Sequence, residues 1–258
     1  MNYQDIQFRL EEGVGFITLN RPEKRNALSM NLMAEMIDLL RTIKKDSEVC
    51  VVILQSEGPV FSSGHDLAEM VEGNAVSYRA TFGACTEMME AIRDLPQPVI
   101  AQVQGMASAA GCQLVATCDL AVASQEARFA TPGVRIGLFC HTPQVPLSRA
   151  IGRKRALEML FTGRAISAAE AERYGLVNRV VPPDRLAAET LNLAKHIAQA
   201  SPLTLALGKQ SFYRQVEAEE NQAYGYAKEM MALNAMTEDA QEGIAAFLKK
   251  RPPKWRGK

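Results

Sequence analysis

The sequence lacks the features that mark nucleic-acid-binding and membrane-spanning proteins. Its 29 basic and 29 acidic side chains give a formal net charge of zero, which removes the general attraction to a phosphate backbone and argues against a nucleic-acid partner. No apolar run approaches the roughly 20 residues that a membrane-spanning helix needs, so no membrane association is expected. Aromatic residues make up only 6% of the chain, but 47% of its 258 residues are hydrophobic, which is enough for a large core.

Cysteine and histidine are scarce and are not arranged as metal ligands. The five cysteines form no CxxC pair, which favours buried, reduced thiols over disulfides. The three histidines lie outside any HExxH or Cys/His spacing, so no metal site is expected. The first thirteen residues contain three acidic side chains and resemble neither a signal peptide nor a transit peptide. We therefore expect a cytoplasmic location.

Short apolar runs in the first half of the chain predict buried strands separated by helices. The predicted strands cover residues 14–19, 50–54, 98–103 and 120–123. Residues 29–44 have apolar side chains at helical spacing, with Ser29 as the N-cap. Because the strands read as continuous apolar runs, they indicate an α/β fold with a mainly parallel sheet covered on both faces.

After about residue 145 the chain is predicted to be mainly helical. The predicted helices cover residues 153–161, 168–174, 184–200, 202–216, 219–236 and 238–250, and residues 176–181 form a strand between them. Several of these helices are rich in Ala and Met on more than one face. This pattern suggests burial against a partner subunit.

Two glycine-containing segments point to chemistry performed by backbone amides. Residues 60–67 (VFSSGHDL) form a turn after a predicted strand, and residues 104–114 (QGMASAAGCQL) place small side chains at a helix start. Free N–H groups at such places can converge on one oxygen as an oxyanion hole. The alternative is that these glycines and alanines only mark tight packing. A phosphate loop is not favoured, since neither GxGxxG nor GKS/T is present. Ser63, His65 and Asp66 lie too close in sequence to form a hydrolase triad.

Six segments of the chain resemble the enoyl-CoA hydratase/isomerase (crotonase) family. They are NRPEKRNAL at 20–28, FSSGHDL at 61–67, PVIAQVQG at 98–105, AGCQL at 110–114, CD at 118–119 and FTGRAISAAEA at 161–171. The segments occur in order over nearly the whole chain. The resemblance implies a crotonase (ClpP-like) spiral of ββα repeats. Residues 1–195 would form the acyl-CoA-binding core and residues 196–258 a C-terminal helical trimerisation region. It also implies a homotrimer or a dimer of trimers, with a coenzyme A thioester as substrate and no permanently bound cofactor.

The resemblance also assigns residues to the site. The backbone N–H groups of His65 and Ala110 would hold the thioester oxygen. Further contacts to the coenzyme A thioester would come from Lys24, Arg25, Ala27, Ser63, Asp66, Leu67, Ala109, Gln113, Pro132, Gly133, Ile136 and Lys250. For Lys250 the alternative is a solvated basic chain end.

The sequence departs from the family at the two positions where its hydratases carry catalytic glutamates. These positions are Gln113 and Gly133. A glutamine cannot accept a proton at neutral pH, and glycine has no side chain. Because general acid–base catalysis contributes roughly 10²–10⁴-fold per group, we do not expect efficient hydration by the two-glutamate mechanism.

Three functions remain open at this point. The leading one is an enzyme that stabilises a thioester enolate, with His141 as a candidate proton donor or base. The neighbouring Cys140 is a weaker candidate for a nucleophile, because nothing in the sequence favours its thiolate. The alternatives are decarboxylation of a malonyl-type acyl-CoA, or a catalytically silent acyl-CoA-binding or regulatory protein. RNA binding, known for an outlier of the family, is disfavoured by the balanced charge.

Overall fold

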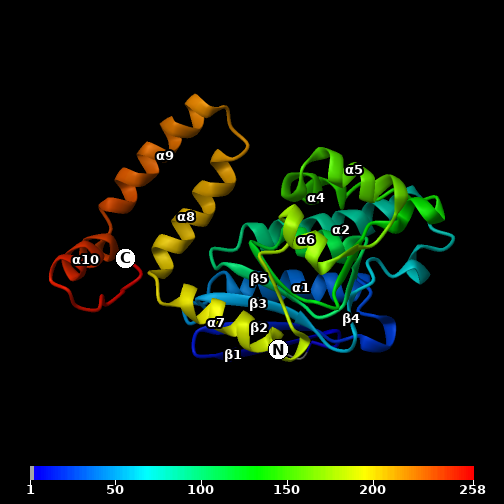
Figure 1. Ribbon diagram of the computed structural model, residues 1–258, viewed down its shortest axis with the longest axis horizontal. Coiled ribbons are helices and arrows are strands. Elements are labelled where there is room, and N and C mark those ends of the chain that lie inside the picture. The colour runs from blue at the N-terminus through cyan, green and yellow to red at the C-terminus, as the bar shows by residue number, and fades with distance from the viewer. Residues whose placement is uncertain (1–2) are drawn as a thin grey trace.

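The computed structural model describes residues 3–258, so residues 1 and 2 of the expected core lie outside the described residues. Within this range the larger sheet has six strands in the order β1-β2-β3-β5-β7-β10, and the smaller sheet has four in the order β4-β6-β8-β9 (Figure 1). The β1–β2 and β8–β9 pairs are antiparallel. The other neighbouring strands are parallel.

The strands and helices have the following bounds. The strands are β1 (Ile6–Glu11), β2 (Val14–Leu19), β3 (Val51–Ser56), β4 (Val60–Ser62), β5 (Val99–Val103), β6 (Met106–Ser108), β7 (Leu120–Ser124), β8 (Arg128–Ala130), β9 (Ile166–Ser167) and β10 (Arg179–Val181). The α-helices are α1 (Met30–Ile43), α2 (Ala75–Arg93), α3 (Ala110–Thr117), α4 (Gln144–Ile151), α5 (Arg153–Thr162), α6 (Ala168–Tyr174), α7 (Leu186–Ala198), α8 (Pro202–Gln215), α9 (Glu220–Ala235) and α10 (Glu238–Leu248). Short 3₁₀ helices are η1 (Pro22–Lys24), η2 (Leu67–Met70), η3 (Pro132–Ile136) and η4 (Pro183–Arg185).

The chain passes repeatedly from the larger sheet to the smaller one. The pairs β3–β4, β5–β6 and β7–β8 each place one strand in the larger sheet and the next in the smaller sheet. Helices α2, α3 and α4 follow these pairs in turn. This repetition is the ββα spiral expected from the sequence, and it brings the ends of β4, β6 and β8 together.

The central strands of the larger sheet are buried on both faces, as their apolar runs predict, whereas the edge strand β1 is mostly exposed. Val51 and Ile53 of β3 pack in one cluster with Leu186 of α7. Val52 and Leu54 point to the opposite face and belong to the main core with α1. Ser29 is the N-cap of α1, and its Oγ accepts a hydrogen bond from the Leu32 amide at 3.1 Å. The predicted mainly parallel sheet and the predicted N-cap are therefore confirmed.

The C-terminal helices leave the main body after α7. Figure 1 shows α8, α9 and α10 as an arm to one side, with α8 and α9 forming an antiparallel pair. Helix α7 itself packs on the larger sheet, and the expected boundary between residues 195 and 196 lies inside it. The division into two domains remains a prediction. The strand expected at 176–181 is shorter, since β10 begins only at Arg179. No helix within residues 3–258 is both long and apolar enough to cross a membrane.

Candidate functional site

The two segments predicted to form an oxyanion hole are in direct backbone contact. Gly64 lies in the turn after β4 and has a φ of +91°, which a glycine adopts without strain. A Cβ atom at Gly64 would lie 2.9 Å from Ala109 Cβ and 3.1 Å from the Ala110 nitrogen. A Cβ atom at Gly111 would lie only 2.4 Å from the Ser62 carbonyl oxygen. The expected close approach of backbone to backbone at the start of α3 is thus confirmed.

The backbone N–H of His65 points away from the neighbouring segment at Leu28. Leu28 and His65 form an isolated parallel bridge, in which the Leu28 amide donates to the Gly64 carbonyl oxygen at 2.8 Å. The Asp66 amide donates to the Leu28 carbonyl oxygen at 3.3 Å. In a parallel bridge the N–H of the middle residue points to the opposite side. Within residues 3–258 the His65 N–H donates no hydrogen bond, so it is available to a ligand.

The second amide belongs to the first residue of α3. Its N–H has no partner within the helix, because the first turn leaves its amides unpaired. The preceding Ala109 has φ 49° and ψ −116°, a conformation that costs a residue other than glycine roughly 1–3 kcal/mol. The Ala109 amide donates to the Ala130 carbonyl oxygen at 2.9 Å, which fixes this corner to β8. The strained corner directs the Ala110 amide out of the start of the helix.

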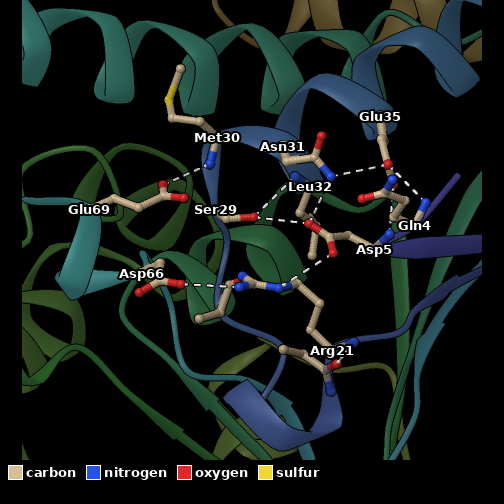
Figure 2. Close-up of polar contacts among 12 residues, drawn as sticks. Gln4, Asp5, Arg21, Ser29, Met30, Asn31, Leu32, Glu35, Asp66 and Glu69 are labelled. Carbon is tan, nitrogen blue, oxygen red and sulfur yellow. Dashed lines mark hydrogen bonds and ion pairs between the residues drawn. The ribbon is translucent and has the colours of Figure 1, made fainter.

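An arginine that the sequence reasoning missed connects the 20–28 loop to this site (Figure 2). The Arg21 guanidinium lies 3.5 Å from an Asp5 oxygen and 3.3 Å from an Asp66 oxygen. It also donates to the Ala27 carbonyl oxygen at 2.9 Å. The Ser63 amide donates to the Arg25 carbonyl oxygen at 3.0 Å. The loop predicted to bind coenzyme A is therefore tied to the Gly64 turn.

Asn26 is a second positioning residue that sequence reasoning missed. It is completely buried, and its Nδ2 donates to the Glu57 and Val60 carbonyl oxygens at 2.8 Å each. Its φ of +50° lies in the left-handed region, which asparagine tolerates better than most residues. The sequence does show an asparagine inside a Pro-containing loop. It does not show which groups bind this side chain, because they lie about thirty residues further along the chain.

The predicted contacts at the coenzyme A end differ in exposure. Lys24 and Arg25 are exposed, Ser63 is half-buried, and Leu67 is 51% exposed. Asp66 has protein partners, since it pairs with Arg21 and accepts from the Ala68 amide at the start of η2. Contacts of these residues with coenzyme A remain predictions.

Gln113 lies one helical turn after Ala110 and is buried. Its backbone N–H donates a hydrogen bond to the Ala109 carbonyl oxygen at 3.0 Å, and the residue is 4% exposed. The side-chain Oε1 has no hydrogen-bond partner among the described residues. The glutamine is thus held beside the oxyanion corner with a free acceptor.

The other glutamate position is closed by the backbone. A Cβ atom on Gly133 would lie 2.0 Å from the Leu138 carbonyl oxygen and 2.8 Å from Cys140 Sγ. The Leu138 amide donates back to the Gly133 carbonyl oxygen at 3.0 Å, which closes this turn after η3. No side chain fits at residue 133 unless the turn moves.

The remaining residues predicted for the acyl end differ in burial. His141 is exposed, and its ring centroid lies 5.0 Å from that of Phe139. Ile136 is 62% exposed and Pro132 is half-buried. Cys140 is buried, and burial raises the pKa of its thiol, which disfavours a thiolate. The catalytic role of His141 remains a prediction.

His65 has a half-buried side chain in addition to its free amide. Its ring meets Phe82 of α2 edge-on, at 5.4 Å between centroids. Both ring nitrogens are buried without a hydrogen-bond partner among the described residues. Burial lowers the pKa of the imidazole below its usual value, so the ring is neutral at pH 7.

Lys250 lies in the arm, just after α10. Figure 1 shows α10 and β4 at opposite sides of the molecule. Within one chain Lys250 is therefore not part of the site around His65 and Ala110. Its predicted contact with coenzyme A would require a second copy of the chain.

The described residues include no group of three or more His, Cys, Asp or Glu side chains that could hold a metal ion. All five cysteines are free, four of them buried and Cys50 partly exposed. The part of the site around His65, Ala110 and Gln113 consists of backbone amides and neutral side chains.

Solved structures share this fold over almost the whole chain. A crystal structure of enoyl-CoA hydratase from Mycobacterium smegmatis matches with a TM-score of 0.95 and 48% identity, covering 98% of this chain and 99% of that one. A crystal structure of human enoyl-CoA hydratase domain-containing protein 3 matches with a TM-score of 0.95 and 46% identity, covering 98% of this chain and all of that one. The crotonase fold expected from the sequence is confirmed.

The comparison with curated proteins corrects the expected cellular location. Mouse enoyl-CoA hydratase domain-containing protein 3 is 48% identical over 248 residues, which is 96% of this chain and 83% of the mouse protein. This relative is named mitochondrial, as are its rat and human counterparts. The cytoplasmic location inferred from the cysteines and the first residues is therefore wrong. Buried free thiols report packing and do not distinguish one reducing compartment from another.

A family model described as enoyl-CoA hydratase/isomerase matches residues 9–258. The match includes the Gly64 turn, the Ala109–Ala110 corner and the arm. It therefore covers both amides of the predicted oxyanion hole. This match, the relatives and the geometry of the two amides together show that the chain belongs to the enoyl-CoA hydratase/isomerase family.

Proposed function

We propose that this protein binds a coenzyme A thioester and stabilises its enolate through the backbone N–H groups of His65 and Ala110. The observation that carries the proposal is the contact between the Gly64 turn and the start of α3, where neither amide has an acceptor among residues 3–258. Amides fixed in this way stabilise negative charge that develops on a carbonyl oxygen.

The residues beside the oxyanion corner argue against efficient hydration. Addition of water needs a group that takes its proton and another that protonates the α-carbon. Gln113 cannot act as a base, and the Leu138 carbonyl oxygen closes residue 133 to any side chain. The protein therefore provides electrostatic stabilisation without the family's pair of carboxylates.

Decarboxylation of a malonyl-type thioester is the alternative reaction. The bond between the α-carbon and the carboxylate breaks, carbon dioxide leaves, and the electron pair forms the enolate held by the two amides. A proton from solvent or a side chain then completes the product. This reaction needs no base to remove a proton from carbon, and Gln113 and Gly133 place no negative charge beside the substrate carboxylate. A catalytically silent acyl-CoA-binding protein is the other alternative.

A panel of coenzyme A thioesters tests the proposal. Thermal unfolding should shift upward with thioesters, because a ligand that binds only the folded chain stabilises it. Turnover of crotonyl-CoA should be residual. Carbon dioxide release from methylmalonyl- and ethylmalonyl-CoA would favour the decarboxylase. Stabilisation without turnover of any ester would favour the silent binder, and no stabilisation by any ester would contradict the proposal.

The coenzyme A end of the site is proposed to include the 20–28 loop and a second copy of the chain. Lys24 and Arg25 are exposed cations on a loop that is tied to the Gly64 turn by the Ser63 amide. A homotrimer, or a dimer of trimers, would allow Lys250 from a neighbouring arm to reach the nucleotide.

A further inference from the structure

Arg21 is a partly buried cation held between two carboxylates (Figure 2). Its side chain is 16% exposed, and those of Asp5 and Asp66 are 18% and 17% exposed. Taking charges out of water is costly unless opposite charges and hydrogen bonds replace their hydration. The fold therefore sets the position of this guanidinium, whereas an exposed arginine on the surface would be free to move.

The peptide bond between Gly64 and His65 sets the direction of the His65 N–H. This peptide is trans, so its C=O and its N–H point in opposite directions. The Gly64 carbonyl oxygen accepts a hydrogen bond from the Leu28 amide at 2.8 Å. The Asp66 amide donates to the Leu28 carbonyl oxygen at 3.3 Å and completes the bridge. A shift of Leu28 relative to this turn would therefore tilt the proposed oxyanion donor.

Arg21 holds both sides of this bridge with one rigid group. Its Nη1 donates to the carbonyl oxygen of Ala27, the residue before Leu28, at 2.9 Å. Its Nη2 donates to the carboxylate of Asp66, the residue after His65, at 3.3 Å. A guanidinium is planar and presents its donors at a fixed spacing. Arg21 thus fixes the two strands of the bridge relative to each other.

Asp5 holds the guanidinium from another side. One Asp5 oxygen lies 3.5 Å from Arg21 Nε. The other Asp5 oxygen accepts hydrogen bonds from Ser29 Oγ at 3.2 Å and from Asn31 Nδ2 at 3.0 Å, as Figure 2 shows. Ser29 and Asn31 belong to the start of α1, which packs in the main core. The network therefore runs from α1 through Asp5 and Arg21 to the Gly64 turn.

We propose that Arg21 is a positioning residue for the oxyanion hole, which acts through Ala27 and Asp66 to aim the His65 N–H at the thioester oxygen. The inference rests on the proposed function, because it assumes that this N–H binds that oxygen. Donors of this kind act only when they are fixed close to the position of the developing charge. Arg21 thereby controls the polarisation of the thioester carbonyl.

A simpler role for Arg21 would be to support the 20–28 loop, which carries the exposed cations Lys24 and Arg25. The two roles make different predictions. Loss of loop support would weaken every ligand that contacts these cations, including coenzyme A without an acyl group. Loss of positioning would change the carbonyl of a bound thioester and leave the affinity for free coenzyme A unchanged.

Infrared difference spectroscopy of butyryl-CoA with an isotope-labelled thioester carbonyl measures the donors directly. Hydrogen bonds from fixed donors polarise the carbonyl, so the wild type should lower its stretching frequency below that of the ester in water. Arg21→Met removes the guanidinium and should lose most of this lowering. Asp66→Asn keeps the shape of the side chain but removes its charge, and it should have the same effect. Arg21→Lys keeps the cation without the planar fork and should restore only part of the lowering.

Titration calorimetry with free coenzyme A supplies the comparison that separates the two roles. We expect its Kd to differ by less than about twofold between the wild type and Arg21→Met. The matched control Arg185→Met removes an exposed arginine that pairs with Glu189 at 2.9 Å, and it should change neither the carbonyl frequency nor the Kd. Thermal unfolding checks that each variant is folded, and Asp66→Asn carries the test if Arg21→Met is not.

The contrary outcomes are distinguishable. If the wild type binds no thioester, or binds butyryl-CoA without lowering the carbonyl frequency, the proposed function fails. If the wild type lowers the frequency and the folded variants lower it equally, the proposed function stands and Arg21 is not a positioning residue. If Arg21→Met weakens free coenzyme A as much as butyryl-CoA, Arg21 acts by supporting the loop, and the inference fails in that case too.

Discussion

At the scale of single residues, the site depends on places where a side chain is missing. Gly64 allows the turn after β4 to contact Ala109 and Ala110, and Gly133 allows the Leu138 carbonyl oxygen to occupy the space of a side chain. The first glycine positions the proposed oxyanion donors. The second one removes a position for a catalytic acid.

Gly64→Ala should impair function and also lower stability, because residue 64 has a φ of +91°. The new Cβ would lie 2.9 Å from Ala109 Cβ and would push the two donor segments apart. We expect kcat on a turned-over thioester to fall roughly 10²–10³-fold, the range seen when an oxyanion donor is lost. Gly83→Ala is the control, because a Cβ there meets nothing within 4 Å. Unchanged turnover by a folded Gly64→Ala protein would contradict the assignment.

Gly133→Ala should destabilise the fold. Its Cβ would overlap the Leu138 carbonyl oxygen, and overpacking of this kind costs roughly 1–3 kcal/mol or more in the free energy of unfolding. Gly208→Ala in α8 has open space and should be neutral or stabilising. Urea denaturation measures both. Equal stability of the two variants would show that the 133–140 turn yields easily.

The His65 imidazole should make stability sensitive to acid. Burial lowers its pKa below 6.5 in the folded chain, so the unfolded chain binds the proton first as pH falls. The free energy of unfolding should therefore decrease as pH falls below 6.5 and through the lower folded pKa. His65→Phe removes this contribution. Parallel pH profiles of the two proteins in urea denaturation would contradict it.

At the scale of elements, a buried ion pair attaches α8 to the main body. Lys209 Nζ lies 2.7 Å from an Asp119 carboxylate oxygen, and its side chain is 7% exposed. It also donates to the Ile92 and Gln97 carbonyl oxygens at 3.1 Å each. Tyr213, one turn further along α8, donates to the other Asp119 oxygen at 2.8 Å. These bonds fix the base of the arm.

Lys209→Met should loosen the arm and destabilise the protein. The substitution leaves Asp119 without its cation, and loss of one partner of a buried pair costs roughly 3–5 kcal/mol. Lys228→Met is the control, since Lys228 is exposed and lies 3.5 Å from an exposed Glu229 oxygen. We expect that control to change the free energy of unfolding by less than about 0.5 kcal/mol. A similar small effect at Lys209 would contradict the role of the pair.

Most of the long elements were predictable from the sequence because each carries its own pattern, but α2, the longest helix within residues 3–258, was not predicted. The observed ends of helices α1, α6, α8, α9 and α10 lie within about two residues of their predicted ends. Strands β4, β6, β8 and β9 have only two or three residues, which is too short for an alternating pattern. The smaller sheet was therefore expected only through the resemblance.

The backbone part of the site was also predictable, but its polar side chains were only partly so. Glycine and alanine at 64 and 109–111 indicated close backbone contact. Thr131 Oγ1 is buried without a hydrogen-bond partner among the described residues. This depends on which atoms surround the hydroxyl after folding, and no local sequence pattern reports that. The closure of Gly133 by Leu138 likewise results from a turn whose shape the residue types do not specify.

At the scale of the whole molecule, the arm exposes apolar side chains that a single chain leaves uncovered. Tyr224, Met231, Met236, Phe247 and Leu248 are each more than two-thirds exposed. Large exposed apolar patches mark interaction surfaces. These residues support the proposed assembly through the arm.

Light scattering after size-exclusion chromatography tests this assembly. The wild type should have the mass of three or six chains of 28.3 kDa. Met236→Asp combined with Phe247→Asp should shift the mass towards one chain, because both residues are about 80% exposed in the isolated chain. Val76→Asp replaces a similarly exposed residue of the main body and should leave the mass unchanged. A wild-type monomer would contradict the assembly.

The most direct test of the central claim is a crystal structure of the protein with a bound coenzyme A thioester. The account predicts that the thioester oxygen lies about 2.7–3.1 Å from the backbone nitrogens of both His65 and Ala110. It also predicts that no aspartate or glutamate side chain contacts the α- or β-carbon. A thioester oxygen held elsewhere, or a carboxylate touching the reacting carbons, would contradict it.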